Sequence, residues 1–348
     1  MKNKKIRVLI VEDSAVMRKI LVEIMSRDPG LEVVGTAPDA LIARDKLVAL
    51  KPDVMTLDIS LPQMDGISFL EKVMCYFPTR TLVISSSTDP GSSNALRAFS
   101  AGAIGVIGKP QMSSVEAMQD FCAELVERIK AVSIAKLALP AQVLREGKTA
   151  PVNDGLKISQ QIIAFAASTG GTEALKQVLS ELPRGMPGIV IVQHMPRFFT
   201  QAFASSLNHM CRMHVKEAED GDKIQPGIAL LAPGDFHMEV IRKGGEHVVR
   251  LHQAPPLHGV RPAADFLLKS VAEHCGSAAI GLILTGMGKD GAAGLLAMRE
   301  AGAKTIVQDE ASSIVFGMPK AAIDQGAAQF VVSLNKIAPT LLQQLEQG

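Results

Sequence analysis

Short apolar runs alternate with helix-like segments through the first 131 residues of the chain. The runs have the length of buried strands, and the segments between them repeat apolar residues at helical spacing, as Val16, Ile20 and Ile24 do. Five strands that alternate with five helices predict a doubly wound, flavodoxin-like parallel sheet of the α/β class. We expect strands at 6–11, 31–35, 54–57, 81–84 and 104–107. We expect helices at 15–27, 40–50, 94–100 and 115–131, and one that follows the turn at 61–66 and ends at residue 76.

The alternation resumes after residue 160 and predicts a second α/β domain with a mostly parallel, doubly wound sheet. Residues 239–253 alternate in polarity around Gly244 and Gly245, a pattern typical of an antiparallel hairpin. The stretch between the two patterns contains scattered proline and glycine, so we interpret it as a linker, although 134–144 could form a helix. The predicted domains are therefore 1–131 and 160–348, joined by 132–159. In the second domain we expect strands at 162–167, 189–193, 228–232, 279–285 and 305–307, and a helix at 172–182.

Composition narrows the classes of protein to which the chain can belong. Its 36 basic and 35 acidic residues give a net charge of +1, which gives no support for nucleic acid or an anionic membrane as a partner. The four cysteines are scattered without a CxxC pair, which favours reduced thiols in a cytoplasmic protein over a zinc site or disulfides. Neither a signal peptide nor an apolar stretch of membrane-spanning length is present, so we expect no membrane insertion.

Polar residues gather at the carboxyl ends of the strands predicted in the first domain, the edge at which such sheets carry their chemistry. Three carboxylates in one crevice repel one another and attract a hard cation such as Mg²⁺. A lysine and a hydroxyl opposite them suit the oxygens of a phosphoryl group. Singly, each residue is more simply a loop cap or a solvent-facing group. The residues are Glu12, Asp13, Asp58, Ser85 and Lys109.

Residues 5–130 resemble the receiver domain of two-component response regulators. The matching motifs are VEDS at 11–14, LDISLPQMDG at 57–66, GKP at 108–110 and the hydroxyl of Ser85. The resemblance implies that Asp58 accepts a phosphoryl group from a partner histidine kinase and that Glu12, Asp13 and Asp58 bind Mg²⁺. It also implies phosphate contacts from Ser85, with Ser86 as the alternative, and from Lys109. Ser60 and Leu61 depart from the usual acidic residue and methionine, beside the site.

Three polar residues of the second half, Ser168, His194 and Asp290, each follow an apolar run. Parallel strands would bring them to one edge of the sheet. A serine needs a base to take its proton, and the base needs a carboxylate to fix its tautomer. Ser168 also precedes a helix, whose N-terminal N–H groups could stabilise an oxyanion. A plain Ser/Gly turn between strand and helix is the structural alternative.

Other residues of the second half could take the same roles, and one motif points elsewhere. His237 and His258 are alternative bases, and Asp235 and Asp309 are alternative acids. The stretch 286–291 matches the dinucleotide fingerprint G-x-G-x-x-G, with Asp309 at the spacing expected of the ribose-binding acid. Against that interpretation, Asp290 would place a carboxylate beside the pyrophosphate, and the motif comes late in its domain.

The second half, over about 160–345, resembles the catalytic domain of the chemotaxis protein-glutamate methylesterases. The resemblance implies Ser168 as nucleophile, His194 as base, Asp290 as orienting acid, and backbone donors near Thr169 and Met287 for the oxyanion. Ala263 and Ala264 depart from the usual serine and valine. The matching motifs are ASTGGTEAL at 167–175, VQHMP at 192–196, LAPGD at 231–235, LTGMGKDG at 284–291 and QDEASSIVFGMPKAA at 308–322.

The two resemblances together imply a chemotaxis response regulator whose output is an esterase. Its substrates would be the glutamate methyl esters of chemoreceptors, with methanol as product, no cofactor for the ester chemistry, and deamidation of receptor glutamines as a possible second activity. Phosphorylation of Asp58 would control access to the active site. Two alternatives remain open: a nicotinamide-dependent dehydrogenase, which would bind NAD, and a non-catalytic regulator, which would be indifferent to the loss of Ser168.

Overall fold

A computed structural model describes residues 4–85, 93–110, 115–137 and 161–347. Contacts divide the chain into two compact units, Met1–Leu144 and Arg145–Gly348, and each is described by itself. The expected linker falls largely on 138–159, which lies outside the described residues, as does Ser86. Within the described residues no helix is long and apolar enough to cross a bilayer. All four cysteines are free in this structure.

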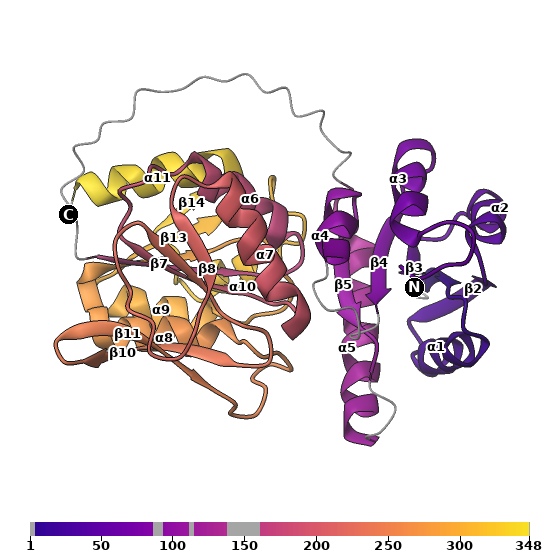
Figure 1. Ribbon diagram of the computed structural model, residues 1–348, viewed down its shortest axis with the longest axis horizontal. Helices are drawn as coiled ribbons and strands as arrows, with labels where there is room; N and C mark the ends of the chain where they lie inside the picture. The colour runs from indigo at the N-terminus through magenta and orange to yellow at the C-terminus, as the bar shows by residue number, and fades with distance from the viewer. Residues whose placement is uncertain (1–3, 86–92, 111–114, 138–160, 348) are drawn as a thin grey trace. The chain divides into compact units, whose positions relative to one another are not determined.

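The first unit is a parallel five-stranded sheet in the order β2-β1-β3-β4-β5, which confirms the predicted doubly wound fold (Figure 1). Its topology reverses between β1 and β3, so the carboxyl ends of these two strands border the crevice in which such folds bind ligands. The elements are β1 Ile6–Val11, α1 Ala15–Arg27, β2 Leu31–Ala37, α2 Ala40–Leu50, β3 Val54–Asp58, α3 Gly66–Tyr76, β4 Arg80–Ser85, α4 Ser93–Ser100, β5 Gly105–Gly108 and α5 Val115–Ile134.

Local chemistry accounts for where the first helices begin. The side chains of Ser14, Asp39 and Asp65 each accept a hydrogen bond from a backbone N–H in the first turn of α1, α2 and α3. These residue types are favoured at that position because they satisfy donors that have no partner inside the helix. Helix α5 continues to Ile134, three residues beyond the expected end at residue 131.

The second unit is a parallel seven-stranded sheet in the order β14-β13-β12-β6-β7-β9-β8, with a separate antiparallel hairpin of β10 and β11. The sheet grows outward in both directions from the neighbouring strands β6 and β12, so its topological switch point lies between them. The elements are β6 Ile162–Ala167, α6 Gly171–Glu181, β7 Gly188–Gln193, α7 Arg197–Met210, β8 His214–Glu217, β9 Ile228–Leu231, β10 His237–Lys243, β11 Glu246–His252, α8 Ala264–Cys275, β12 Ala279–Ile283, α9 Ala292–Glu300, β13 Lys304–Gln308, α10 Met318–Asp324, β14 Phe330–Val332 and α11 Leu334–Glu346, with a 3-10 turn at Gly276–Ala278.

Helices cover both faces of this sheet, and the hairpin packs against α8 (Figure 1). Alternate residues of the central strands, such as Ala164, Ala166, Val190 and Val192, share a buried cluster with α8, α9 and the hairpin. The hairpin turns at Gly244 and Gly245, as the alternating pattern predicts. The sequence pattern missed two strands, β8 and β14, which are short and lie at the two edges of the sheet.

Candidate functional site

The acidic residues of the first unit meet at the switch point between β1 and β3. One oxygen each of Glu12, Asp13 and Asp58 lies within 4.8 Å of the others. Lys109 enters from the end of β5, with Nζ 2.7 Å from Asp58 Oδ2 and 3.0 Å from Glu12 Oε1. Ser85 ends the neighbouring strand β4 and is buried, and its carbonyl accepts a 2.7 Å hydrogen bond from the Lys109 N–H. The structure therefore brings all five predicted residues to one edge of the sheet.

The electrostatics of this cluster favour a cation. Burial raises the pKa of Glu12 above its ordinary 4.5, and the charge of Asp58 adds to the effect of burial, while Lys109 opposes both. Burial works to lower the pKa of Lys109, but its bonds to Asp58 and Glu12 outweigh burial and raise it. Three oxygen donors this close together form the ligand set that Mg²⁺ prefers, so the residues present fit that ion.

Ser168 follows β6 directly, in a turn that leads into α6. The serine is buried, its N–H donates to Thr285 O at 3.0 Å, and its carbonyl accepts from Gly171 N at 2.7 Å. Gly170 precedes the helix with φ of +79°, a conformation that glycine adopts without strain. The turn places Ser168 at the junction of β6 and the segment after β12, which is the switch point of the second sheet.

His194 follows β7, the strand beside β6, and forms a buried pair with Asp290. The distance from His194 Nε2 to Asp290 Oδ2 is 2.7 Å, and the His194 N–H donates to Ala167 O at 3.0 Å. Both side chains are at least 95% buried. Among the residues that the structure describes, Ser168 Oγ makes no hydrogen bond. Serine–base hydrogen bonds commonly tighten only when substrate binds, so this geometry leaves His194 available as the base.

Asp290 is held by two backbone donors besides His194. Ala264 N donates to its Oδ2 at 2.6 Å and Asp265 N to its Oδ1 at 3.0 Å, both from the first turn of α8. Burial works to raise the pKa of Asp290, but the hydrogen bond and charge of His194, together with these backbone donors, outweigh burial and lower it below 3.8. The carboxylate is therefore ionised at neutral pH, and Nε2 of His194 carries the proton that it donates to Asp290.

Two buried side chains that the sequence pattern did not single out fix the turn that carries Ser168. Gln193 Nε2 donates to the carbonyls of Ser168 at 2.9 Å and His194 at 3.2 Å. Thr285 Oγ1 donates to Thr169 O at 3.0 Å. A glutamine at the end of the otherwise apolar strand β7 was the one signal in the sequence, because a buried polar group needs partners.

The segment after β12 approaches the serine closely because it carries glycine. A Cβ at Gly286 would lie 2.9 Å from Ser168 Cβ, closer than a side chain tolerates. The neighbouring Met287 N–H and the Thr169 N–H lack an acceptor within the described part of the chain. Two unpaired backbone donors beside a serine are the arrangement that stabilises an oxyanion.

The alternative residues are engaged elsewhere. Burial lowers the pKa of His237, whose Nδ1 accepts from Ala263 N, and its Nε2 lies 3.2 Å from Pro255 O. Asp235 binds Arg261, and Asp309 accepts from the N–H and hydroxyl of Ser312. His258 does lie near the site, paired with a different carboxylate. Of the fingerprint glycines, Gly286 allows a close approach to Ser168, whereas Gly288 has open space beside it. Asp290 would place a carboxylate at the start of α9, where the fingerprint binds a pyrophosphate.

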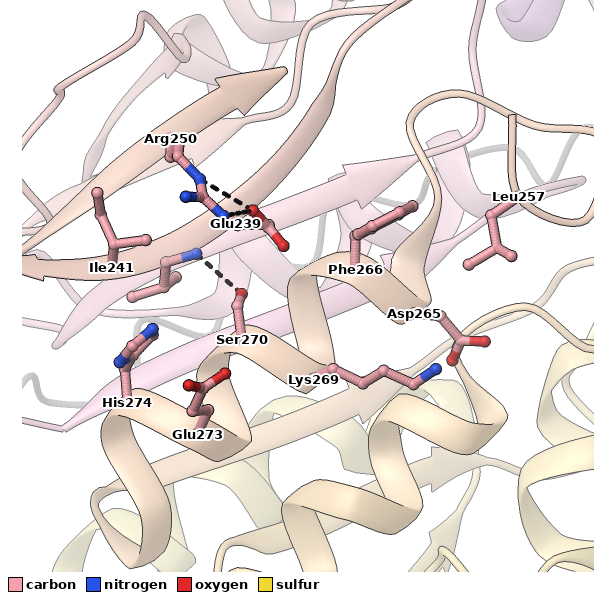
Figure 2. Close-up of a pocket in the computed structure, with 11 residues that line it drawn as sticks. Glu239, Ile241, Arg250, Leu257, Asp265, Phe266, Lys269, Ser270, Glu273 and His274 are labelled. Atoms are coloured by element: carbon pink, nitrogen blue, oxygen red, sulfur yellow. Dashed lines mark hydrogen bonds and ion pairs between the residues drawn. The ribbon is translucent and has the colours of Figure 1, made fainter. Parts of the chain in front are cut away.

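A pocket of about 350 Å³ lies between the hairpin and α8 (Figure 2). Its lining includes Asp265, Phe266 and Lys269 from α8 and Glu239 and Arg250 from the hairpin. Ser168, His194 and Asp290 are not among its lining residues, so this pocket adjoins the predicted catalytic residues without containing them. Glu239 and Arg250 bind each other across the hairpin.

Comparison with known proteins accounts for both units. A family model described as "Response regulator receiver domain" matches residues 8–119, and one described as "CheB methylesterase" matches 163–341. A Bdellovibrio bacteriovorus protein named "Protein-glutamate methylesterase/protein-glutamine glutaminase" is 53% identical over 99% of this chain and 98% of its own length. The Salmonella typhimurium protein of that name is 46% identical, with the same coverage of both chains.

The solved structures add a likeness in fold. The Thermotoga maritima CheB methylesterase catalytic domain is 40% identical, with a TM-score of 0.52, over 53% of this chain and 98% of that one. The sequence matches run through both units, and the solved domain matches one of them in fold. The chain therefore belongs to the CheB methylesterase family, in the form that carries an N-terminal response regulator receiver domain.

Proposed function

We propose that this chain hydrolyses glutamate methyl esters, and deamidates glutamines, in proteins. The buried His194–Asp290 pair, at 2.7 Å and next to Ser168 at the switch point, is the observation that carries the proposal. The names of the relatives that share both domains support the same reaction. The esters and amides that fit a chemotaxis enzyme of this family are those of chemoreceptor side chains.

In the first half of the reaction, Ser168 Oγ attacks the ester carbonyl carbon. Because Nε2 of His194 faces Asp290, Nδ1 is the nitrogen that accepts the serine proton. Asp290 stays ionised and stabilises the imidazolium that forms. The oxyanion accepts from the Thr169 and Met287 N–H groups, and His194 then protonates the departing oxygen, so methanol leaves and an acyl-serine remains.

The second half repeats this sequence with water. His194 takes a proton from water, which attacks the acyl carbon, and the imidazolium returns the proton to Ser168 Oγ as glutamate is released. A glutamine substrate differs only in its leaving group, because ammonia departs in place of methanol. The ester chemistry therefore uses residues of the chain alone.

Release of methanol from methylated receptor tests the catalytic assignment. Ser168→Ala in the full chain should abolish most of the activity, and adding His194→Ala should cost little more, because members of one catalytic unit are non-additive. Asp235→Asn is the matched control, since it alters an alternative acid and should leave the rate near wild type. Near-normal hydrolysis by Ser168→Ala would exclude the serine mechanism.

We further propose that Asp58 accepts a phosphoryl group from a histidine kinase, with Glu12, Asp13 and Asp58 holding Mg²⁺. When bound, the ion would offset the negative charge of the phosphoryl group. A carboxylate oxygen of Asp58 attacks phosphorus and the donor's leaving group departs, which forms an acyl phosphate. Lys109, 2.7 Å from Asp58 Oδ2, then pairs with a phosphoryl oxygen, and the Ser85 hydroxyl lies on the neighbouring strand end.

Labelling with acetyl phosphate and Mg²⁺ tests the acceptor. The wild-type chain should gain a base-labile phosphoryl group, and Asp58→Asn should not. Asp53→Asn, which alters another aspartate of the same unit, is the control and should label normally. We also propose that phosphorylation raises the esterase rate. Asp58→Asn should therefore keep its basal methanol release but lose stimulation by acetyl phosphate, and stimulation that persists would contradict this control.

A further inference from the structure

Helices α8 and α9 both begin without a capping side chain of their own. The residues at their N-terminal boundaries are Ala263 and Gly291, and neither provides a side-chain hydrogen bond. The first turn of a helix has backbone N–H groups without partners inside the helix, and buried ones need an acceptor. Both helix starts lie in the buried cluster, so water does not supply it.

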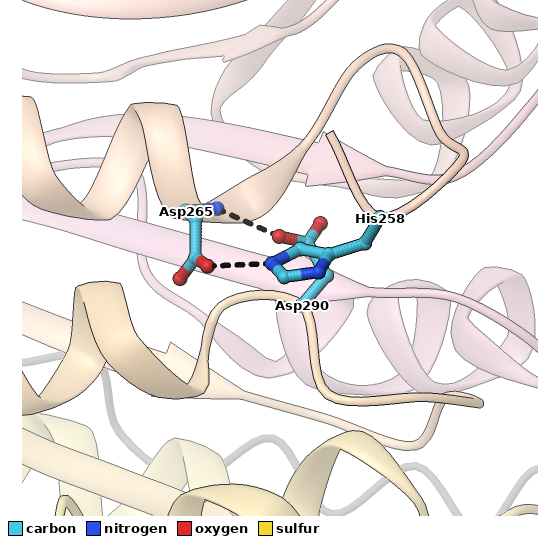
Figure 3. Close-up of side chains that lie close together, drawn as sticks. All are labelled: His258, Asp265 and Asp290. Atoms are coloured by element: carbon cyan, nitrogen blue, oxygen red, sulfur yellow. Dashed lines mark hydrogen bonds and ion pairs between the residues drawn. The ribbon is translucent and has the colours of Figure 1, made fainter. Parts of the chain in front are cut away.

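The two helices cap each other: a carboxylate beside the start of α9 caps α8, and a carboxylate in the first turn of α8 caps α9. We call these hydrogen bonds the reciprocal caps. Asp290, two residues before α9 begins, accepts from Ala264 N and Asp265 N at the start of α8. Asp265, in the first turn of α8, accepts from Gly294 N at the start of α9, at 2.7 Å from its Oδ1. These bonds join the segment that carries Asp290 to the start of α8 from both sides. Figure 3 shows one of them, from Asp265 N to Asp290.

The second oxygen of Asp265 is also engaged. His258 Nε2 lies 3.0 Å from Asp265 Oδ2, so His258 and Asp265 repeat the pairing of His194 and Asp290. Ligand atoms of His258, Asp265 and Asp290 lie within 4.8 Å of one another. Two carboxylates this close would repel, but each faces a histidine and the N-terminus of a helix, whose partial positive charge offsets the repulsion.

We propose that Asp265 is a positioning residue of the esterase: through Gly294 it fixes the start of α9 and so aims Asp290 at His194. The inference rests on the proposed function, in which Asp290 orients the base. Asp265 does not reach His194 itself, and its effect passes through the reciprocal caps. Loosening of the Asp290 segment should misplace the base in the transition state more than it weakens the binding of substrate.

Kinetics of methanol release by the full chain test this role. Asp265→Ala should lower kcat by about tenfold to a hundredfold, the range that small misplacement of catalytic groups produces, and should leave KM within about twofold of wild type. Asp265→Asn keeps an oxygen that can accept from Gly294 N, so it should restore kcat to within about threefold. Should Asp265→Ala fail to fold, Asp265→Ser replaces it, because its shorter side chain falls short of Gly294, and the same loss is expected.

Asp222→Ala provides the matched control. Asp222 also binds one backbone N–H, that of Glu219, and one basic side chain, that of Lys216, but it lies beside the edge strand β8. The Asp222→Ala variant should be less stable than wild type but keep the wild-type kcat. A wild-type kcat in Asp265→Ala, a rise in KM alone, or an Asp265→Asn variant as slow as Asp265→Ala would each overturn the proposal.

The same experiment separates this inference from the proposed function. If the wild-type chain released no methanol, or if Ser168→Ala were as fast as wild type, the proposed function would fail. If wild type is active and depends on Ser168 while the Asp265 variants match it, the reciprocal caps are structural only and the positioning role alone fails.

Discussion

The amide of Gln193 is predicted to hold Ser168 and His194, the proposed nucleophile and base, together, and Gln193→Met measures its contribution. Gln193 is 2% exposed, and its Nε2 donates to the carbonyls of Ser168 and His194. Methionine has nearly the same length but no N–H donor, so the substitution leaves the packing filled and removes both hydrogen bonds.

The size of the effect follows from what each carbonyl loses. A buried acceptor left without a partner costs about 1–3 kcal/mol. Ser168 O still accepts from Gly171 N at 2.7 Å, so its loss lies at the low end, whereas His194 O has no other donor among the described residues. Together these give at most about 2–4 kcal/mol, because methionine also removes Gln193 Oε1, which is buried without a partner among the described residues. The Tm of a unit of this size should therefore fall by up to roughly 5–15 °C. The rate should fall too, because both residues are then held less firmly.

Thermal unfolding of the full chain, followed with methanol release, measures both effects. Gln344→Met is the matched control, because Gln344 is also buried, in α11, and its amide makes no hydrogen bond within the described part of the chain. That variant should unfold within about 2 °C of wild type. If Gln193→Met also unfolds within about 2 °C of wild type and keeps its kcat, the amide does not join the two strand ends as argued.

Three further predictions concern other contacts. Gly286→Ala should lower kcat at least tenfold, because its Cβ would lie 2.9 Å from Ser168 Cβ, whereas Gly185→Ala, with open space around it, should not; equal rates would refute the close approach. Lys109→Met should destabilise the first unit by about 3 kcal/mol in urea unfolding at pH 7, since it leaves two buried carboxylates without their cation. Because the folded pKa of Lys109 is raised, this contribution is fully present below pH 10.5 and disappears as pH rises through the higher folded value; a difference that vanishes between pH 7 and 9 would contradict it. The folded pKa of Asp290 is lowered, so its contribution to stability is fully present above pH 3.8 and is lost only as pH falls through the still lower folded value. Titration of Asp290 should therefore not change the stability difference between wild type and Asp290→Asn from pH 7 to pH 5.

The fold could be predicted from the sequence because its strands and helices follow local periodicity. The run Ile162–Ala167 is wholly buried in β6, and its short, uncharged apolar sequence favoured a buried strand, although periodicity alone did not exclude a helix. The edge strands β8 and β14 were missed because they are too short for a periodic pattern. Strand β8 has four residues, two of which are charged, and β14 has three residues that are all at least partly exposed. Alternating parallel strands also placed Ser168, His194 and Asp290 at one edge, since carboxyl ends of parallel strands meet there.

The supporting contacts of the site could not be predicted in the same way. Asp265 and Gly294 are 29 residues apart, and their hydrogen bond depends on how α8 and α9 pack, which no local pattern specifies. Gln193 was visible as a polar residue in an apolar run, but the sequence does not say which carbonyls it binds. The sequence shows which residue types could carry out the chemistry, whereas the contacts that position those residues can be seen only in the packed structure.

The outward growth of the seven-stranded sheet from β6 and β12 has a consequence for how the second unit can change. Strands added or altered at either margin, beside β8 or β14, lie several strands from the crevice. Insertions, surface redesign and fused domains should therefore be tolerated at these margins and poorly tolerated between β6 and β12. In a library of random insertions sorted for retained esterase activity, the surviving insertions should lie near β8 and β14 and be absent between β6 and β12.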